Sequence, residues 1–179
     1  MLGAPYPRRM KLRTALMFLA PLLAVLLVAC GSGGGVTPRQ QTLAEEVLAQ
    51  VNAARASGAN CGGVQRPAVS RVALSDRLIQ AAQIHSDDME SMRQLTHTGS
   101  DGSNPGQRIA RTGYQAATWG ENAAVGYRAE AAVVAGWLRS EGHCNNMMNA
   151  AYTEIGAARA GDYWTLVLAR PRYTRLTRP

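Results

Sequence analysis

The chain has 179 residues and a formal net charge of +7. Four of its positive charges lie in the first 13 residues and four in the last ten, whereas residues 40–169 carry ten arginines against twelve acidic side chains. Because this central part is slightly acidic and contains no RNA-binding motif, we expect no interaction with nucleic acid.

Residues 1–29 are predicted to be a lipoprotein signal peptide. A basic start is followed by an apolar stretch over residues 16–28, which is the order of a secretory signal. The alternative is a transmembrane helix, but the apolar stretch is short for one and a glycine-rich segment follows it at once. Translation starts at Met1 or at Met10, since residues 10–30 form a complete signal by themselves.

The end of this segment, LVAC, resembles the lipobox of bacterial lipoproteins. In those proteins the cysteine, here Cys30, receives a diacylglycerol and becomes the mature N-terminus. We therefore expect export across the cytoplasmic membrane and attachment to a membrane through the lipid, on the periplasmic or cell-surface side.

Three further segments follow Cys30. Residues 30–41 are rich in glycine and predict a flexible tether. Residues 42–170 are expected to fold as one domain, because about 130 to 150 residues suit a single core. Residues 171–179 form a basic tail.

Two amphipathic helices are expected in the first half of the domain. Thr42 and Glu45 have the spacing of a capping box, which predicts a helix from there to about Ala56. An apolar stripe predicts a second helix over residues 76–93. His85 lies on that stripe, and we expect it to be buried and satisfied by a hydrogen bond.

The middle of the domain alternates turns with short elements. Pro105 predicts the first turn of a short helix that ends at Arg111. Residues 119–127 are expected to be extended, with Trp119 more readily placed in the core than in a cleft. A further helix should begin near Ala129 and stop at Gly142, and a turn should follow it.

The end of the chain has a strand-like period. Residues 153–159 and 163–169 predict an antiparallel hairpin, apolar enough to be covered on both faces. Helices first and strands last predict an α+β sandwich.

The cysteines bear on the chemistry of the segment SEGHC. If Cys30 carries a lipid, Cys61 and Cys144 remain, and two cysteines outside the cytoplasmic membrane are expected to form a disulfide. Such a bond removes Cys144 as a nucleophile or zinc ligand. It also fixes the segment that carries His143 to the loop around Cys61.

The order of several motifs is similar to that of the bacterial branch of the CAP superfamily, which is named for cysteine-rich secretory proteins, antigen 5 and pathogenesis-related proteins. Its members are also called SCP-like extracellular domains. The likeness runs from Leu43 to Ala169 and implies an α–β–α sandwich around a small antiparallel sheet covered by helices. The motifs are HTGSDGSNPGQRI, GENAAVGY, VVAGWLRSEGHCNNMMN, TEIG and YWTLVLA.

The resemblance also implies a cleft with two histidines and two acidic residues. Carried over to this sequence, the first three are His97, Glu121 and His143. The fourth position departs from the family pattern: Glu141 lies near His143 but in a different register. Glu154 is another candidate, better suited to a structural role at the start of a strand.

The chemistry of such a cleft admits several interpretations. The two imidazoles of His97 and His143 and the carboxylate of Glu121 suit zinc or another divalent cation. A binding module for a lipid, wall or protein ligand demands least of the residues, and we expect this function, in a monomer. The alternative is a protease-like hydrolase, either metal-dependent or using a histidine–glutamate acid–base pair.

Overall fold

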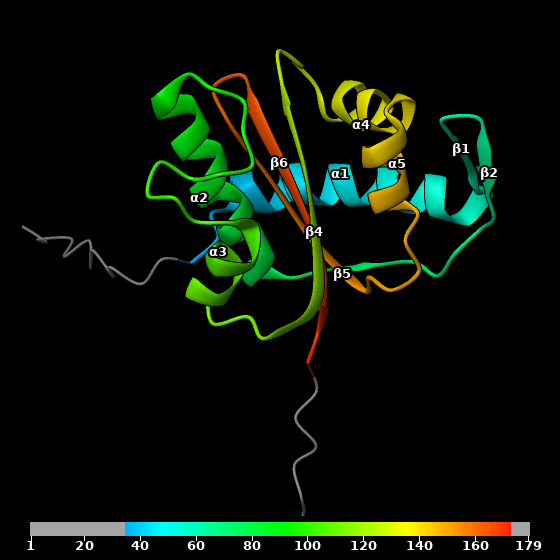
Figure 1. Cartoon of the computed structure of the whole chain (residues 1–179), viewed down its shortest axis with the longest axis horizontal. Coiled ribbons are helices and arrows are strands. Elements are labelled where there is room, and N and C mark those ends of the chain that lie inside the picture. The colour runs from blue at the N-terminus through cyan, green and yellow to red at the C-terminus, as the bar shows by residue number, and fades with distance from the viewer. Residues whose placement is uncertain (1–34, 173–179) are drawn as a thin grey trace, which may run out of the picture. The chain divides into compact units, whose positions relative to one another are not determined.

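The computed structural model describes residues 35–172, which form a separate two-stranded hairpin and a four-stranded sheet with helices on both faces (Figure 1). The strands lie in the order β3 (Ala73–Leu74), β5 (Glu154–Ala160), β6 (Tyr163–Pro171) and β4 (Ala116–Val125). Neighbouring strands are antiparallel, except for the short parallel pair of β3 with β5. The predicted α+β class and the β5–β6 hairpin are confirmed.

Two apolar clusters fill the spaces between the sheet and its helices. One lies between the sheet and α1 (Pro38–Ser57), α4 (Glu130–Arg139) and α5 (Glu141–Met147). The other lies between the opposite face and α2 (Asp76–Met92) and α3 (Pro105–Arg111). Strand β6 supplies both clusters, because Leu166 and Leu168 face one layer whereas Val167 and Ala169 face the other. The α–β–α sandwich therefore follows from alternation along one buried strand.

The first helix begins four residues before the predicted N-cap. Thr37 is the N-cap of α1: its hydroxyl accepts from the backbone of Gln40, and the Gln40 side chain accepts from the backbone of Thr37. Pro38 then occupies the first turn. The predicted capping box at Thr42 is wrong, since this hydroxyl donates to the Pro38 carbonyl within the helix. Residues 38–41 are thus helical rather than tether.

The predicted turn after Gly142 is also wrong. Residues 141–147 form the helix α5, and the chain breaks instead at Ser140, whose backbone is extended (φ −94°, ψ 123°). The hairpin of β1 (Ala59–Cys61) with β2 (Val64–Arg66) was not predicted either. Its turn uses Gly62 and Gly63, both with positive φ.

The edge strand β4 is covered by side-chain donors. Alternate carbonyls, those of residues 119, 121 and 123, point away from β6, and each accepts a hydrogen bond from α4, from α5 or from the segment after α5. The donors are Tyr152 Oη to Trp119 at 3.0 Å, Asn146 Nδ2 to Glu121 at 3.2 Å and Trp137 Nε1 to Ala123 at 3.3 Å. These bonds fix α4 and the segment after it to the strand that carries Glu121.

A buried arginine joins α1 to the segment around α5. Arg55 has no exposed surface, and its guanidinium donates to the carbonyls of Ser70, Met147, Asn149 and Tyr152 at 2.6–3.3 Å. Burial lowers the pKa of Arg55. Backbone carbonyls, rather than a carboxylate, thus satisfy this buried cation.

The predicted disulfide between Cys61 and Cys144 is confirmed. It joins β1 to α5 directly after His143. Among residues 35–172, no helix combines the length and apolar character needed to cross a membrane. The predicted signal peptide and Cys30 lie outside the described residues.

Replacing both Cys61 and Cys144 by alanine should destabilise the domain. The bond closes a loop with a sequence separation of 83 residues, for which the chain-entropy model gives about 4.5 kcal/mol. Urea denaturation of the oxidised protein and of the double variant measures the difference in unfolding free energy. Equal stability of the two proteins would contradict this role for the bond.

Candidate functional site

Glu121 is the centre of the site. It lies on β4 with its side chain turned toward α2 and α3, and that side chain is only 2% exposed. Oε2 accepts from Arg108 Nη2 at 2.8 Å, and Oε1 accepts from His97 Nδ1 at 2.9 Å. A buried carboxylate is costly unless it is paired and hydrogen-bonded, and both of its oxygens are satisfied here.

Arg108 holds the His97 loop as well as the carboxylate. Its guanidinium, 2% exposed, donates to the backbone carbonyls of Ser103 at 2.8 Å and His97 at 3.0 Å. Sequence reasoning missed this residue, because an arginine on a short helix gives no signal that it is buried. The nearest clue was Pro105, which correctly placed α3.

The loop between α2 and α3 is ordered by polar side chains of the loop and of α2. Asp88 accepts from the backbone of Ser100 at 2.8 Å, and Asp101 accepts from the backbone of Ser103 at 2.9 Å. Asn104 then starts α3 with a capping box completed by Gln107. The loop therefore presents His97 in a defined position.

His85 is buried beneath this loop, as predicted. Its Nε2 is 2.7 Å from the carbonyl of Thr96 and 3.6 Å from Glu121 Oε1. Burial lowers the pKa of His85, although the charge of Glu121 opposes that shift. The imidazole thus supports the Thr96–His97 backbone.

His97 presents its ring to solvent. The side chain is 56% exposed, and its hydrogen bond to Glu121 raises its pKa. In the neutral form Nδ1 carries the proton that Glu121 accepts, so Nε2 is left with a free lone pair.

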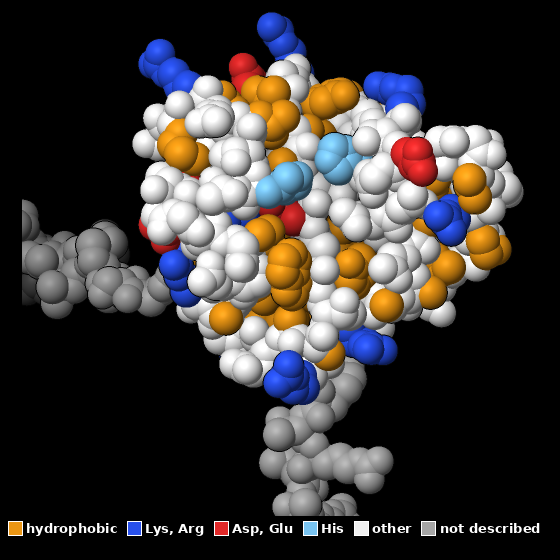
Figure 2. Space-filling view, viewed as in Figure 1, with side chains coloured by type: hydrophobic (Ala, Val, Ile, Leu, Met, Phe, Trp, Pro, Cys, Tyr) orange, Lys and Arg blue, Asp and Glu red, His pale blue; other side chains and the backbone are white. Residues whose placement is uncertain are grey.

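His143 reaches the same place from the other helical layer. It lies on α5, and its backbone carbonyl accepts from Asn122 Nδ2 at 3.0 Å. Burial, and next the charge of His97, lower its pKa. Figure 2 shows two histidine side chains next to each other on one face; these are His97 and His143, because His85, the remaining histidine, is wholly buried.

The site therefore lies over β4, at the edge of the sheet. Figure 1 shows β4 between α2 and α3 on one side and α4 and α5 on the other. His97 comes from the first layer and His143 from the second, and Glu121 lies on the strand between them. Three residues far apart in sequence thus contribute to one surface.

Glu141 and Glu154, the two candidates for the second acidic residue of the site, lie elsewhere. The exposed side chain of Glu141 is packed over Gly62 in the β1–β2 turn, where an added Cβ would come within 2.7 Å of it. Glu154 begins β5, opposite Ala169 of β6. Three of the residues carried over from the family, His97, Glu121 and His143, therefore lie in one site. Arg108 also belongs to this site but was not among the residues carried over.

The part of the chain that the structure describes holds no ready-made cluster of three metal-ligating side chains. Within residues 35–172, no three histidine, cysteine, aspartate or glutamate side chains are grouped so that they could hold a metal ion. Both oxygens of Glu121 already accept hydrogen bonds, one of them from a guanidinium. Binding of a divalent cation by His97, His143 and Glu121 stays a prediction.

Trp119 is exposed, contrary to the expectation that it lies in the core. The residue is 41% exposed, whereas Trp137 and Trp164 are buried. The indole rests against Gly106 in the first turn of α3, where an added Cβ would lie 2.7 Å from Nε1. Trp119 is on the same face of β4 as Glu121, two residues away.

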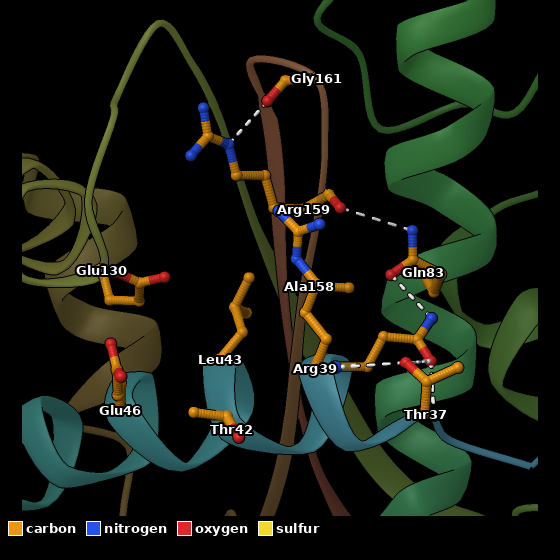
Figure 3. A pocket seen from close by; sticks show the side chains of 11 residues that line it. Thr37, Arg39, Thr42, Leu43, Glu46, Gln83, Glu130, Ala158, Arg159 and Gly161 are labelled. Carbon is orange, nitrogen blue, oxygen red and sulfur yellow. Dashed lines mark hydrogen bonds between the residues drawn. The ribbon is translucent and has the colours of Figure 1, made fainter.

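A cavity elsewhere in the domain is separate from these residues. It has a volume of about 780 Å³ and lies between α1, α2, the β5–β6 turn and the start of α4 (Figure 3). Arg39 and Arg159 line it together with Glu46 and Glu130. Arg159 is already held there by the carbonyl of Gly161 at 2.6 Å.

A family model for the cysteine-rich secretory protein family, CAP, matches residues 48–167. The chain belongs to this family. The site residues His97, Glu121 and His143 all lie within the matched range of the CAP domain.

The curated relatives are two proteins of Bacillus subtilis (strain 168). The uncharacterized protein YkwD is 29% identical over 103 residues, which cover 56% of this chain and 40% of YkwD. The uncharacterized membrane protein YlbC is 32% identical over 81 residues, which cover 45% of this chain and 23% of YlbC. The chain spans less than half the length of these relatives.

Solved structures share the fold. An extracellular protein containing a SCP domain from Bacillus anthracis str. Ames superposes with a TM-score of 0.65 at 23% identity, over 76% of this chain and 45% of that one. An outer surface protein from Borrelia burgdorferi gives 0.63 at 20% identity, over 76% and 96% of the two chains. These similar proteins are extracellular or surface proteins.

His97 and His143 should titrate on opposite sides of the ordinary histidine pKa of 6.5. Glu121 favours the charged form of His97, so this pair stabilises the fold fully below that value and loses its effect as the pH rises through the raised pKa. NMR titration of the imidazole signals measures both values, and Glu121→Gln should lower that of His97. A His97 signal that titrates below 6.5 in the unmodified protein would refute the pairing.

Proposed function

We propose that this CAP domain is an extracytoplasmic binding module, held at a membrane through a lipid on Cys30, whose cleft binds a component of the cell envelope. The observation that carries the proposal is the placement of His97 and His143, from opposite helical layers, side by side on the surface above a buried carboxylate. The exposed imidazole of His97 and the half-buried imidazole of His143 offer hydrogen bonds to a ligand in a fixed arrangement.

The internal pairing of Glu121 supports binding over catalysis by the carboxylate itself. Its oxygens are occupied by Arg108 and His97, so this side chain positions the imidazole and does not face the solvent. Cys144 is oxidised and offers no nucleophile. The location is supported by the surface and extracellular proteins that share the fold.

One feature favours a second candidate, an acid–base hydrolase. Glu121 accepts the Nδ1 proton of His97, which leaves Nε2 as a base directed away from the carboxylate. Hydrolases orient a catalytic histidine in this way. In such a reaction His97 would take a proton from water and Glu121 would stabilise the resulting imidazolium.

Co-sedimentation with separated envelope fractions tests the binding function. The purified domain should bind the lipid, wall or protein fraction, and the double change of His97 and His143 to alanine should weaken binding at least tenfold. Gln50→Ala, on the exposed face of α1, is the control and should bind as the unmodified domain does. Equal binding by the double variant, or binding to none of the fractions, would overturn the proposal.

The same incubation separates the two candidate functions. The hydrolase would be favoured if the unmodified domain releases soluble fragments from a fraction and the Glu121→Gln variant does not. Binding without release favours the binding module.

Lipid attachment has its own measurement. Mass spectrometry of the mature protein from its native membrane should show a diacylglycerol on an N-terminal Cys30 and no free thiol. An intact sequence before Cys30 would contradict this anchor.

A further inference from the structure

We propose that the cleft ligand is a glycan, with one sugar ring stacked on Trp119 and neighbouring hydroxyl groups bonded to His97 and His143. This inference rests on the proposed binding function and names its ligand class. It starts from an aromatic side chain that is held in place and yet exposed, beside polar groups that are fixed by the fold.

The indole of Trp119 is positioned by backbone. It touches Gly106 in the first turn of α3, where any larger residue would collide with Nε1, Cε2 and Cζ2 of the ring. The residue is nevertheless 41% exposed. An aromatic ring that is fixed on one side and open to solvent on another offers an apolar surface at little entropic cost.

The ring lies beside the histidine pair. Trp119 and Glu121 point to the same face of β4 and are separated by about 7 Å along the strand. Both contact α3, Trp119 through Gly106 and Glu121 through Arg108. The indole and the imidazole of His97 therefore border one strip of surface, which is apolar at one end and polar at the other.

The charges in this strip favour a ligand without a cation. Both oxygens of Glu121 are engaged by Arg108 and His97, so this carboxylate offers nothing further to an ammonium group. The groups that remain are imidazole nitrogens, which can accept or donate to hydroxyl and amide groups. A quaternary ammonium ligand suits this arrangement less well, although its cation would interact with the indole.

An acyl chain fits the strip less well than a sugar does. It would need a continuous apolar groove, whereas the strip passes directly from the indole to imidazoles. A sugar ring has apolar C–H faces and a rim of hydroxyl groups, and these two features match the two ends of the strip.

Tryptophan quenching provides a selective measurement. The chain has three tryptophans, and Trp137 and Trp164 are 1% and 0% exposed, so iodide reaches chiefly Trp119. Chitotetraose, a β-1,4-linked tetramer of N-acetylglucosamine, serves as the probe with the full-length protein. Binding should protect Trp119 from iodide, and dodecanoate and choline should not.

Calorimetry with chitotetraose then tests the residues. Trp119→Ala should weaken binding at least tenfold, whereas Trp119→Phe should retain most of it. Gly106→Ala should weaken binding while keeping the indole, because the new Cβ displaces the ring. Val125→Ala is the matched control, since Val125 is also 41% exposed and lies on the same strand; it should bind as the unmodified protein does.

The outcomes distinguish this inference from the proposed function. Absence of chitotetraose binding, or equal binding by a Trp119→Ala variant that is folded by circular dichroism, overturns the glycan assignment. Histidine-dependent binding to an envelope fraction would then leave the binding function standing. Protection by dodecanoate or choline in place of chitotetraose also overturns the assignment.

Discussion

The site depends on one buried ion pair, between Glu121 and Arg108. Neither side chain is more than 2% exposed, so each would be strongly unfavourable without the other. The pair does more than neutralise charge, because the guanidinium also holds the carbonyls of Ser103 and His97. One arginine thereby fixes the carboxylate, the start of α3 and the loop that presents the imidazole. Loss of the guanidinium would leave a buried carboxylate and two backbone carbonyls without this donor.

The second requirement is that two helical layers meet over one strand. Asn146 bonds both the backbone of Glu121 and the side chain of Asn122, and Asn122 in turn bonds the carbonyl of His143. The disulfide holds the adjacent Cys144 to β1. His143 therefore occupies its place through backbone contacts and a covalent bond, and its ring is left available for a ligand.

Sequence patterns predicted the fold well where the signal was local. The apolar stripe of α2, Pro105 at the start of α3 and the alternation of the final hairpin all gave elements close to those observed. The N-terminal boundary was wrong because two threonines, Thr37 and Thr42, each have a capping partner at the right spacing, and only the three-dimensional bonds decide between them. Helix α5 was missed because Gly142 is tolerated within it.

The site was predictable only in part. Family resemblance gave His97, Glu121 and His143, since these lie in recognisable motifs, but no spacing in the sequence brings the three together. Arg108 and the exposure of Trp119 escaped prediction for a common physical reason. Both depend on how α3 packs against β4: Gly106 leaves room for the indole, and the guanidinium two residues later reaches the carboxylate. Such complementarity is a property of the packed elements and has no local signature.

The covering of β4 has a consequence for encounters between copies of the domain. A long edge strand with free carbonyls is a template on which a second molecule can add a strand. Here Tyr152, Asn146 and Trp137 already occupy alternate carbonyls along that edge, and the opposite edge consists of the two-residue strand β3. Copies of the domain that meet are thus discouraged from pairing their sheet edges into one continuous sheet.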